Sequence, residues 1–290
     1  MKVSGFTIVR NGIKFDYPIV EAIQSILPIC DEMIVSVGNS DDETLALIRN
    51  ILSPKIKIIE SVWDDSLREN GKVLAVETNK AYHSISPDSD WAFYIQADEV
   101  FSEKDMPKIK SAMEKYLHDE KVEGLLFNHM NFYASFDYIA NSRKWCKNEI
   151  RVIRNDKRIS SYKDAMSFRK NDEKLKVKFV DATIYHYGWV KHPETQQRKR
   201  NEFEKLWHND EWIKKYIVTN TEFDYTKIDS LKLFKGEHPA VMYERIRRQN
   251  WKFAYDPIQK VKSSLYLKFL NYFEKVTGLE IGRFKNYKII

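Results

Sequence analysis

The segment WAFYIQADEVF, residues 91–101, joins an apolar run to an acidic turn. Its first five residues are almost all aliphatic or aromatic, which is typical of a strand buried on both faces of a parallel sheet. The run then meets Gln96, Asp98 and Glu99, whose polar side chains a hydrophobic core excludes unless they are paired or functional. Ligands of open α/β sheets bind beyond the carboxyl ends of strands, where paired carboxylates suit Mg²⁺ or Mn²⁺ and its phosphates. A strand that ends in a solvated acidic turn is the alternative, and these residues alone favour neither.

Strands and helices alternate on the N-terminal side of this segment. Apolar runs predict buried strands at 3–9, 33–37 and 55–59. Apolar residues at helical spacing predict helices at 19–27, from the Ser40 cap to about residue 50, and at 72–84. Ser40 and Glu43 have the spacing of a capping box, which is expected to open the second helix. The alternation predicts an α/β fold with a mostly parallel sheet.

The pattern changes after residue 101. We expect a surface helix at 103–118, a strand at 124–127 and an irregular aromatic segment at 128–148. Short strands are predicted at 149–153, 177–180 and 183–187. Helices are predicted at 193–208, 211–218, 239–250 and 258–276. The organisation expected from this order is a domain over residues 1–190 and a helical C-terminal extension over 191–290 that packs on it.

Composition excludes several classes of protein. The chain has 290 residues, of which 43% are hydrophobic and 31% charged, as in a globular protein without a membrane span. Residues 191–290 hold 21 Lys and Arg against 13 Asp and Glu, a net charge of +8, while the rest is mildly acidic. This is not the signature of a dedicated nucleic-acid binder. With Cys30 and Cys146 as its two cysteines and no signal-peptide pattern at its start, the chain is expected to be cytoplasmic.

Three motifs in order carry a resemblance to a known family. They are TIVRN at 7–11, NSDDET at 39–44 and IQADE at 95–99. The set resembles the GT-A glycosyltransferases of the family 2 type, which implies a Rossmann-like GT-A domain. It also implies transfer of a sugar from a nucleotide-diphosphate donor to a saccharide or lipid-linked acceptor, with inversion, in surface polysaccharide synthesis. Two positions depart from the family pattern: Gly38 stands where many relatives have Asp, and Gln96 replaces the first acid of the D-x-D-type motif.

The resemblance assigns the donor site to the turns that follow the first strands. Nucleotide-sugar contacts are expected from one set of residues: Asn11, Asn39, Asp42, Lys72, Gln96 and Asp98. Asp98, Glu99 and His186 are expected to bind Mn²⁺ or Mg²⁺, with Asp98 the main ligand because Gln96 brings no charge. Asn and Asp also favour turns for local reasons, and a histidine among aromatic residues is often part of a core.

The catalytic base implied by an inverting transfer is a carboxylate in the second half of the domain. Asp164, in SYKDAMSF, is the predicted base, because its aromatic and apolar neighbours would desolvate it and raise its pKa. Asp181 and Glu149 compete with it for this role.

Basic and aromatic residues supply two weaker expectations. Arg143 and Arg151 are predicted to meet phosphate and Trp145 to stack on a sugar, although a solvated basic loop explains them equally well. The helix at 260–276 carries lysines that would suit an anionic membrane surface and a lipid-linked acceptor. Packing of this helix on the domain is the preferred prediction.

Two other functions remain open from the sequence. A catalytically silent GT-A-like protein that binds nucleotide or sugar would explain Gln96. A nucleotidyltransferase also uses an α/β sheet with acidic metal ligands, but Arg10, Asn11 and Gly12 are a poor substitute for its glycine-rich phosphate loop.

Overall fold

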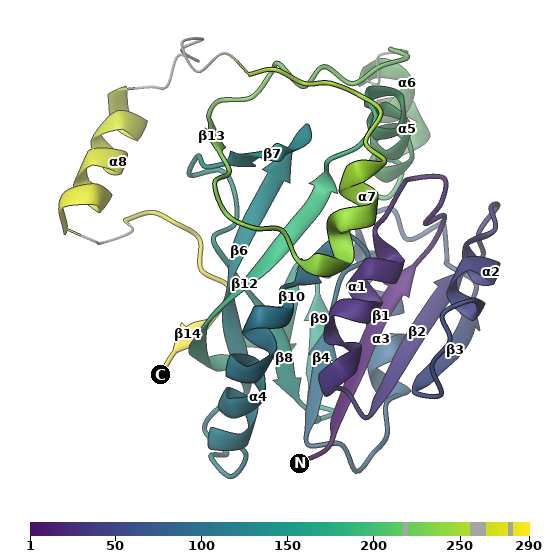
Figure 1. Cartoon of the computed structure of the whole chain (residues 1–290), viewed down its shortest axis with the longest axis vertical. Coiled ribbons are helices and arrows are strands. Elements are labelled where there is room, and N and C mark those ends of the chain that lie inside the picture. The colour runs from purple at the N-terminus through teal and green to yellow at the C-terminus, as the bar shows by residue number, and fades with distance from the viewer. Residues whose placement is uncertain (217–219, 256–264, 278–280) are drawn as a thin grey trace.

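The structure is a computed structural model, which describes residues 1–216, 220–255, 265–277 and 281–290 (Figure 1). Its parallel half contains β1 (Val3–Val9), β2 (Glu32–Gly38), β3 (Ile56–Ser61) and β4 (Trp91–Tyr94). These strands lie in the order β3-β2-β1-β4, and every neighbouring pair is parallel. The helices that connect them are α1 (Ile19–Ile26), α2 (Thr44–Arg49) and α3 (Lys72–His83). The predicted alternation is therefore confirmed.

The sheet continues through antiparallel strands beside β4. β8 (Asn148–Arg154) lies antiparallel between β4 and β6 (Gly124–Tyr133). β12 (Lys176–Trp189) runs parallel to β6, and β5 (Glu99–Phe101) pairs antiparallel with β12. The outer strands are β7 (Ser135–Ala140), β13 (Leu231–Leu233) and β14 (Lys288–Ile289). A small second sheet contains β9 (Ile159–Tyr162), β10 (Ser167–Lys170) and β11 (Glu173–Lys174). This curled α/β sheet is the GT-A-like, Rossmann-type arrangement that the resemblance predicted.

Two predictions for the second half were wrong. The segment 128–148, expected to be irregular, contains the long β6–β7 hairpin, with Ala134 at its turn in the left-handed region (φ 64°). The strands expected at 177–180 and 183–187 form one strand, β12, with a register shift between Phe179 and Thr183.

The remaining helices are α4 (Met106–Lys115), α5 (Pro193–Glu204), α6 (Asp210–Tyr216), α7 (Tyr243–Arg247) and α8 (Leu265–Thr277). Short 3-10 turns lie at Leu27–Ile29, Glu103–Asp105 and Ala240–Met242. The helix predicted at 239–250 is thus shorter than expected. Of the helix predicted at 258–276, residues 258–264 lie outside the described residues.

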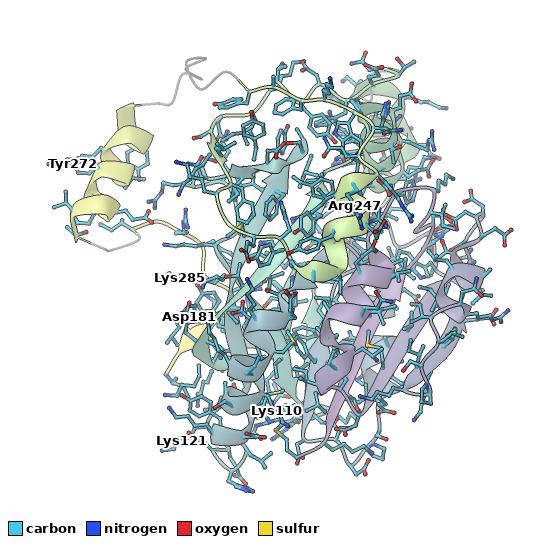
Figure 2. All side chains as sticks on the ribbon, viewed as in Figure 1. Lys110, Lys121, Asp181, Arg247, Tyr272 and Lys285 are labelled. Carbon is cyan, nitrogen blue, oxygen red and sulfur yellow. The ribbon has the colours of Figure 1, made fainter. Side chains whose placement is uncertain are left out.

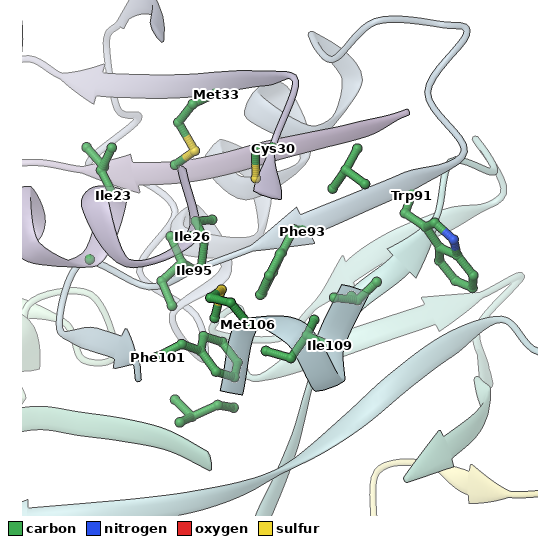
Figure 3. Packing of buried hydrophobic residues seen from close by; sticks show 14 of the residues in the cluster. Ile23, Ile26, Cys30, Met33, Trp91, Phe93, Ile95, Phe101, Met106 and Ile109 are labelled. Atoms are coloured by element: carbon green, nitrogen blue, oxygen red, sulfur yellow. The ribbon is translucent and has the colours of Figure 1, made fainter. Parts of the chain in front are cut away.

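Strand β4 divides the core into two layers, because successive side chains of a strand point to opposite faces. Trp91, Phe93 and Ile95 pack with α1 and α4 on one face (Figure 3). Ala92 and Tyr94 pack with α3 on the other. All five side chains are at most 1% exposed, so β4 is the central strand that its apolar run predicted.

The C-terminal hundred residues make close contacts with the N-terminal half. The Lys191 ammonium donates a hydrogen bond to the Asp16 carbonyl over 2.7 Å, and the Tyr225 hydroxyl donates to the Lys191 carbonyl over 3.0 Å. Arg245 on α7 forms ion pairs with Glu21 on α1 and with Asp16, at 2.9 and 2.5 Å. These contacts fix α5 and α7 over the carboxyl ends of the parallel strands.

Helix α8 contacts the domain through the ion pair of Glu274 with Arg143, but much of its apolar face, predicted to pack on the domain, is exposed. Tyr266, Phe269, Tyr272 and Val276 are each more than 60% exposed, while Leu270 is buried. Figure 2 shows Tyr272 on this helix, which stands at the edge of the molecule. Within the described residues no helix is long and apolar enough to cross a membrane.

Candidate active site

A cleft of about 1330 Å³ opens beyond the carboxyl ends of β1 and β4. After β1 the chain moves to β2 and β3 on one side, and it then returns to β4 on the other side of β1. The ends of β1 and β4 therefore form a topological switch point, where open α/β sheets bind their ligands. Asn11 lines the cleft after β1, and Gln96 and Asp98 line it after β4.

Asp98 lies at the centre of the polar part of the cleft. Its Oδ2 is 3.2 Å from the Lys199 ammonium of α5 and 3.6 Å from Nε2 of His186 on β12. The Lys199 ammonium also donates a hydrogen bond to the Gly188 carbonyl over 3.1 Å. A Cβ atom at Gly188 would lie 2.5 Å from the His186 ring and 2.6 Å from Asp98 Oδ2, so this close approach requires glycine.

Strand pairing explains why Asp98 and His186 meet. β5 begins directly after Asp98 and pairs with β12 so that Glu99 lies opposite His186. The Tyr187 amide donates to the Asp98 carbonyl over 2.8 Å, which extends this pairing to Asp98. The Asn131 side chain of β6 holds Nδ1 of His186 at 2.9 Å and thereby orients the ring towards Asp98.

Opposing effects set the charges in this group. Burial raises the pKa of Asp98, but the Lys199 ammonium and His186 outweigh it and hold that pKa well below its ordinary value. Burial lowers the pKa of His186 despite the nearby carboxylate. Burial also lowers the pKa of Lys199, but Tyr17 and Asp98 reverse this and leave it raised. Asp98 is therefore a carboxylate and Lys199 an ammonium at neutral pH.

Glu99 and Arg151, both predicted to serve the site, bind each other instead. Glu99 is fully buried, and its two carboxylate oxygens accept hydrogen bonds from Nε and Nη2 of Arg151, each over 2.6 Å. Nε2 of His129 lies 3.1 Å from the same carboxylate, and Nη1 of Arg151 donates to the Ile150 carbonyl. In this arrangement Glu99 has no oxygen free for a metal and Arg151 no face free for a phosphate.

Gln96 connects the end of β4 to the loop that holds Asp164. Its side-chain amide donates a hydrogen bond to the Ala165 carbonyl over 3.2 Å. Asp164 lies at the tip of the β9–β10 hairpin, between Lys163 and Ala165, which both adopt left-handed conformations (φ 53° and 60°). Asp164 lines the cleft, and burial raises its pKa.

The two competing carboxylates occupy different surroundings. Glu149 lines the cleft, and burial raises its pKa, but its carboxylate accepts a hydrogen bond from the Cys146 thiol at 2.8 Å and lies 3.6 Å from Arg151. Asp181 is exposed on β12 and does not line the cleft; Figure 2 shows it at the outer edge of the molecule.

Three of the predicted nucleotide contacts do not line the cleft. The Asn39 side chain accepts a hydrogen bond from the backbone amide of Trp63. The Asp42 carboxylate accepts hydrogen bonds from the backbone amides of Lys14 and Thr44, so both side chains stabilise the local turns. The predicted Ser40–Glu43 capping box is not formed: Glu43 is the N-cap of α2 without a side-chain capping hydrogen bond, and Asp42 accepts the Thr44 amide at the start of the helix. Lys72 begins α3 and does not reach the cleft. The predicted roles of these three side chains have no support in this geometry.

Trp63 occupies the space that Gly38 leaves open. A Cβ atom at Gly38 would overlap the Trp63 indole, and Trp63 lines the cleft with Arg10 stacked 5.7 Å from its ring centre. Arg10 also forms an ion pair with Asp65 at 2.5 Å. The departure at Gly38 thus exchanges a carboxylate for an aromatic surface.

An aromatic wall forms another part of the cleft. It consists of Tyr133, Trp145 and Trp189, with ring centres 5.7 to 5.9 Å apart. Trp145 therefore lines the cleft as predicted for a sugar-stacking residue. Arg143 lies outside the cleft and forms an ion pair with Glu274 of α8.

The donor set does not fit a resident divalent ion as it is arranged. Asp98 and His186 offer two ligands at neighbouring positions, which alone would suit an ion completed by phosphate oxygens. However, the Lys199 ammonium already lies against Asp98 Oδ2, where it would repel a dication. Among the described residues no group of three His, Cys, Asp or Glu side chains could hold a metal.

Sequence reasoning missed Lys199, Tyr17, His129 and Asn131. The ring centre of Tyr17 lies 4.8 Å from the Lys199 ammonium, and both side chains line the cleft. His129 and Asn131 were assigned to an irregular segment, although strand β6 brings them beside Glu99 and His186. No local motif marks Lys199, because its partner lies 101 positions earlier in the chain.

Comparisons with known proteins found distant solved structures and no matching family. No model of a protein family matches the chain, and neither does any curated protein. Among solved structures, TarS 1–349 from S. aureus is 13% identical over 70% of this chain and 64% of its own, with a TM-score of 0.38. The chain therefore spans less than two thirds of that structure.

Two further similar structures are complexes. Glucosyl-3-phosphoglycerate synthase from Mycobacterium tuberculosis, with Mn²⁺, UDP and phosphoglyceric acid, is 20% identical over 45% of this chain and 43% of its own (TM-score 0.30). Mannosyltransferase PcManGT from Pyrobaculum calidifontis, with GDP-Man and Mn²⁺, is 17% identical over 45% and 36% (TM-score 0.33). At these scores the likeness carries no argument about the activity of this chain.

Proposed function

We propose that the protein is a glycosyltransferase that transfers a sugar from a nucleotide-diphosphate donor to a saccharide or lipid-linked saccharide acceptor. The observation that carries the proposal is the cleft at the switch point, which combines the Asp98–Lys199–His186 group with an aromatic wall. Such a cleft suits a ligand with an anionic diphosphate at one end and sugar rings at the other. A role in surface polysaccharide synthesis rests on the family resemblance.

The donor lies across the ends of β1 and β4 in this proposal. Its nucleoside meets Asn11 and the Trp63 surface, and its diphosphate meets the charged group at Asp98. The Mn²⁺ or Mg²⁺ expected from the resemblance stays a prediction. No step is assigned to the ion, because Asp98 forms an ion pair with Lys199 and Glu99 forms one with Arg151.

Asp164 acts as the general base in the proposed reaction. Its carboxylate takes the proton of an acceptor hydroxyl while that oxygen attacks the anomeric carbon of the sugar. The bond between this carbon and the diphosphate oxygen breaks, and the electron pair leaves with the nucleoside diphosphate. Attack from the face opposite the leaving group inverts the anomeric centre. The raised pKa of Asp164 suits this role, because a stronger base accepts the proton more readily.

Thermal unfolding with UDP-, GDP-, CMP- and dTDP-sugars tests the donor class. A ligand that binds only the folded state raises the melting temperature by mass action. We expect one nucleotide class to raise it, and release of the free nucleotide to follow when the acceptor is supplied. Trp63→Ala, which removes the aromatic surface proposed to meet the nucleoside, should weaken the shift, whereas Asp172→Asn, at an exposed turn residue, should keep it. A protein that binds none of these donors would refute the proposal, while donor binding without sugar transfer or hydrolysis would favour the catalytically silent alternative.

A further inference from the structure

Two lysines and one carboxylate lie close to Tyr17, which lines the cleft. The ammoniums of Lys199 and Lys191 each lie 4.8 Å from the ring centre of Tyr17. Lys199 pairs with Asp98, whereas the fully buried Lys191 donates to the carbonyl of Asp16 rather than to a carboxylate. Protonation of Lys191 thus places two positive charges beside one negative charge.

We propose that the Lys199 ammonium is the cation that meets the diphosphate of the donor, in the place where the resemblance expects a divalent ion. The identity of the diphosphate as part of a nucleotide-sugar rests on the proposed function. The cation itself is inferred from the contacts of Lys199.

Three contacts hold the Lys199 ammonium in position. Asp98 Oδ2 and the Gly188 carbonyl accept its hydrogen bonds over 3.2 and 3.1 Å, and the Tyr17 ring lies beneath it. The lysine side chain remains 14% exposed and lines the cleft, so an anion can reach it. A fixed ammonium of this kind binds a phosphate as a point charge without rearrangement of the site.

A metal ion and Lys199 compete for one position. A dication bound to Asp98 Oδ2 would lie beside the ammonium, and the repulsion between the two charges would displace one of them. Lys199 belongs to α5, and the contacts of Lys191 anchor this helix. The Lys199 ammonium is therefore in position before the nucleotide-sugar binds. The proposal thus predicts binding of the donor in the absence of metal.

Calorimetric titration with pyrophosphate, UDP, GDP and dTDP, each with EDTA or with Mn²⁺, tests this inference. The wild-type protein should bind pyrophosphate and one nucleotide in EDTA, with dissociation constants within about threefold of those in Mn²⁺. Lys199→Met, which keeps the length of the side chain and removes its charge, should weaken binding in EDTA at least tenfold. Lys214→Met, at an exposed lysine of α6 outside the cleft, is the matched control and should leave binding unchanged.

The outcomes separate the inference from the proposed function. Nucleotide binding that needs Mn²⁺ and is unaffected in Lys199→Met would overturn the inference and leave the proposed function standing. Pyrophosphate binding in EDTA that depends on Lys199, without binding of any nucleotide, would support the lysine site and remove the nucleotide-sugar function. Absence of binding by any of these probes in both conditions would overturn both.

A second measurement needs no variant. UDP alone binds part of the Mn²⁺, so the reference is the electron paramagnetic resonance signal of free Mn²⁺ with UDP, and this signal should keep its amplitude when wild-type protein is added. Loss of signal equivalent to one ion per chain would overturn the inference, even if Lys199→Met fails to fold.

Discussion

Neutralisation of Glu99 should destabilise the folded protein by several kcal/mol. Glu99→Gln preserves the shape of the side chain but removes the charge that faces Arg151, which is 2% exposed. The guanidinium would keep only the more distant carboxyl of Glu149, 3.6 Å away. Removal of one partner leaves an uncompensated buried charge, and such changes typically cost about 3–5 kcal/mol.

The pKa of Glu99 gives an independent magnitude. Burial raises this pKa, but the Arg151 guanidinium and His129 outweigh burial and lower it from 4.5 to about 2. A shift of this size corresponds to about 3 kcal/mol of stability at neutral pH. Because the folded-state pKa is the lower one, this stability is present above about pH 4.5 and is lost as the pH falls towards about 2.

Urea unfolding followed by circular dichroism at pH 7, 4.5, 3.5 and 2.5 tests both statements. Glu99→Gln should unfold at lower urea than wild type at pH 7, and the difference should shrink as the pH falls. Glu114→Gln, at an exposed position of α4, is the control. The double variant Glu99→Leu, Arg151→Met should recover part of the loss, because it removes both members of the closest buried ion pair. A Glu99→Gln protein as stable as the control at pH 7, or a difference that does not change with pH, would refute the reasoning.

Three further predictions concern the site and the core. Gly188→Ala places a Cβ 2.6 Å from Asp98 Oδ2. Overpacking of this kind should lower the free energy of unfolding in urea by about 1–3 kcal/mol, and unchanged stability would contradict the assigned geometry. Asp164→Asn should lower kcat about 100-fold or more with donor affinity intact, and a variant with wild-type kcat would exclude Asp164 as the base. Because the pKa of Asp164 is raised, wild-type activity should fall as the pH decreases through a value above 3.8. Phe93→Ala should lower the free energy of unfolding, measured in urea, by about 3–5 kcal/mol. Phe179→Ala should have a much smaller effect, because the Phe179 side chain is 45% exposed, and equal effects would count against the burial of β4.

The parallel half of the fold was predictable because its signals are local. The nearly unbroken apolar run of residues 91–95 identifies a strand buried on both faces, and the helices around it have regular apolar spacing. The β6–β7 hairpin was not predictable in the same way. Its polar residues His129 and Asn131 interrupt the apolar run, because they hydrogen-bond to Glu99 and His186 instead of packing in a core.

The site was predictable only where one segment contains its parts. Asp98 follows directly from the acidic turn after β4, and Asp164 from a carboxylate among apolar neighbours. The pairing of Glu99 with Arg151 depends on how β8 lies beside β4, which no local pattern reveals. The Asp98–Lys199 pair depends in the same way on where α5 packs against the sheet.

The origin of Lys199 in α5 restricts how this protein can be divided. A boundary at residue 190, as the sequence suggested, would separate Asp98 from its ammonium and Asp16 from Lys191. In a fragment that ends there, the Asp98 carboxylate would lie beside His186 without its counter-ion, Lys199. A chimera that carries the C-terminal hundred residues of a relative would therefore have, beside Asp98, the side chain that the relative supplies. That side chain would decide whether the site prefers an anion or a metal.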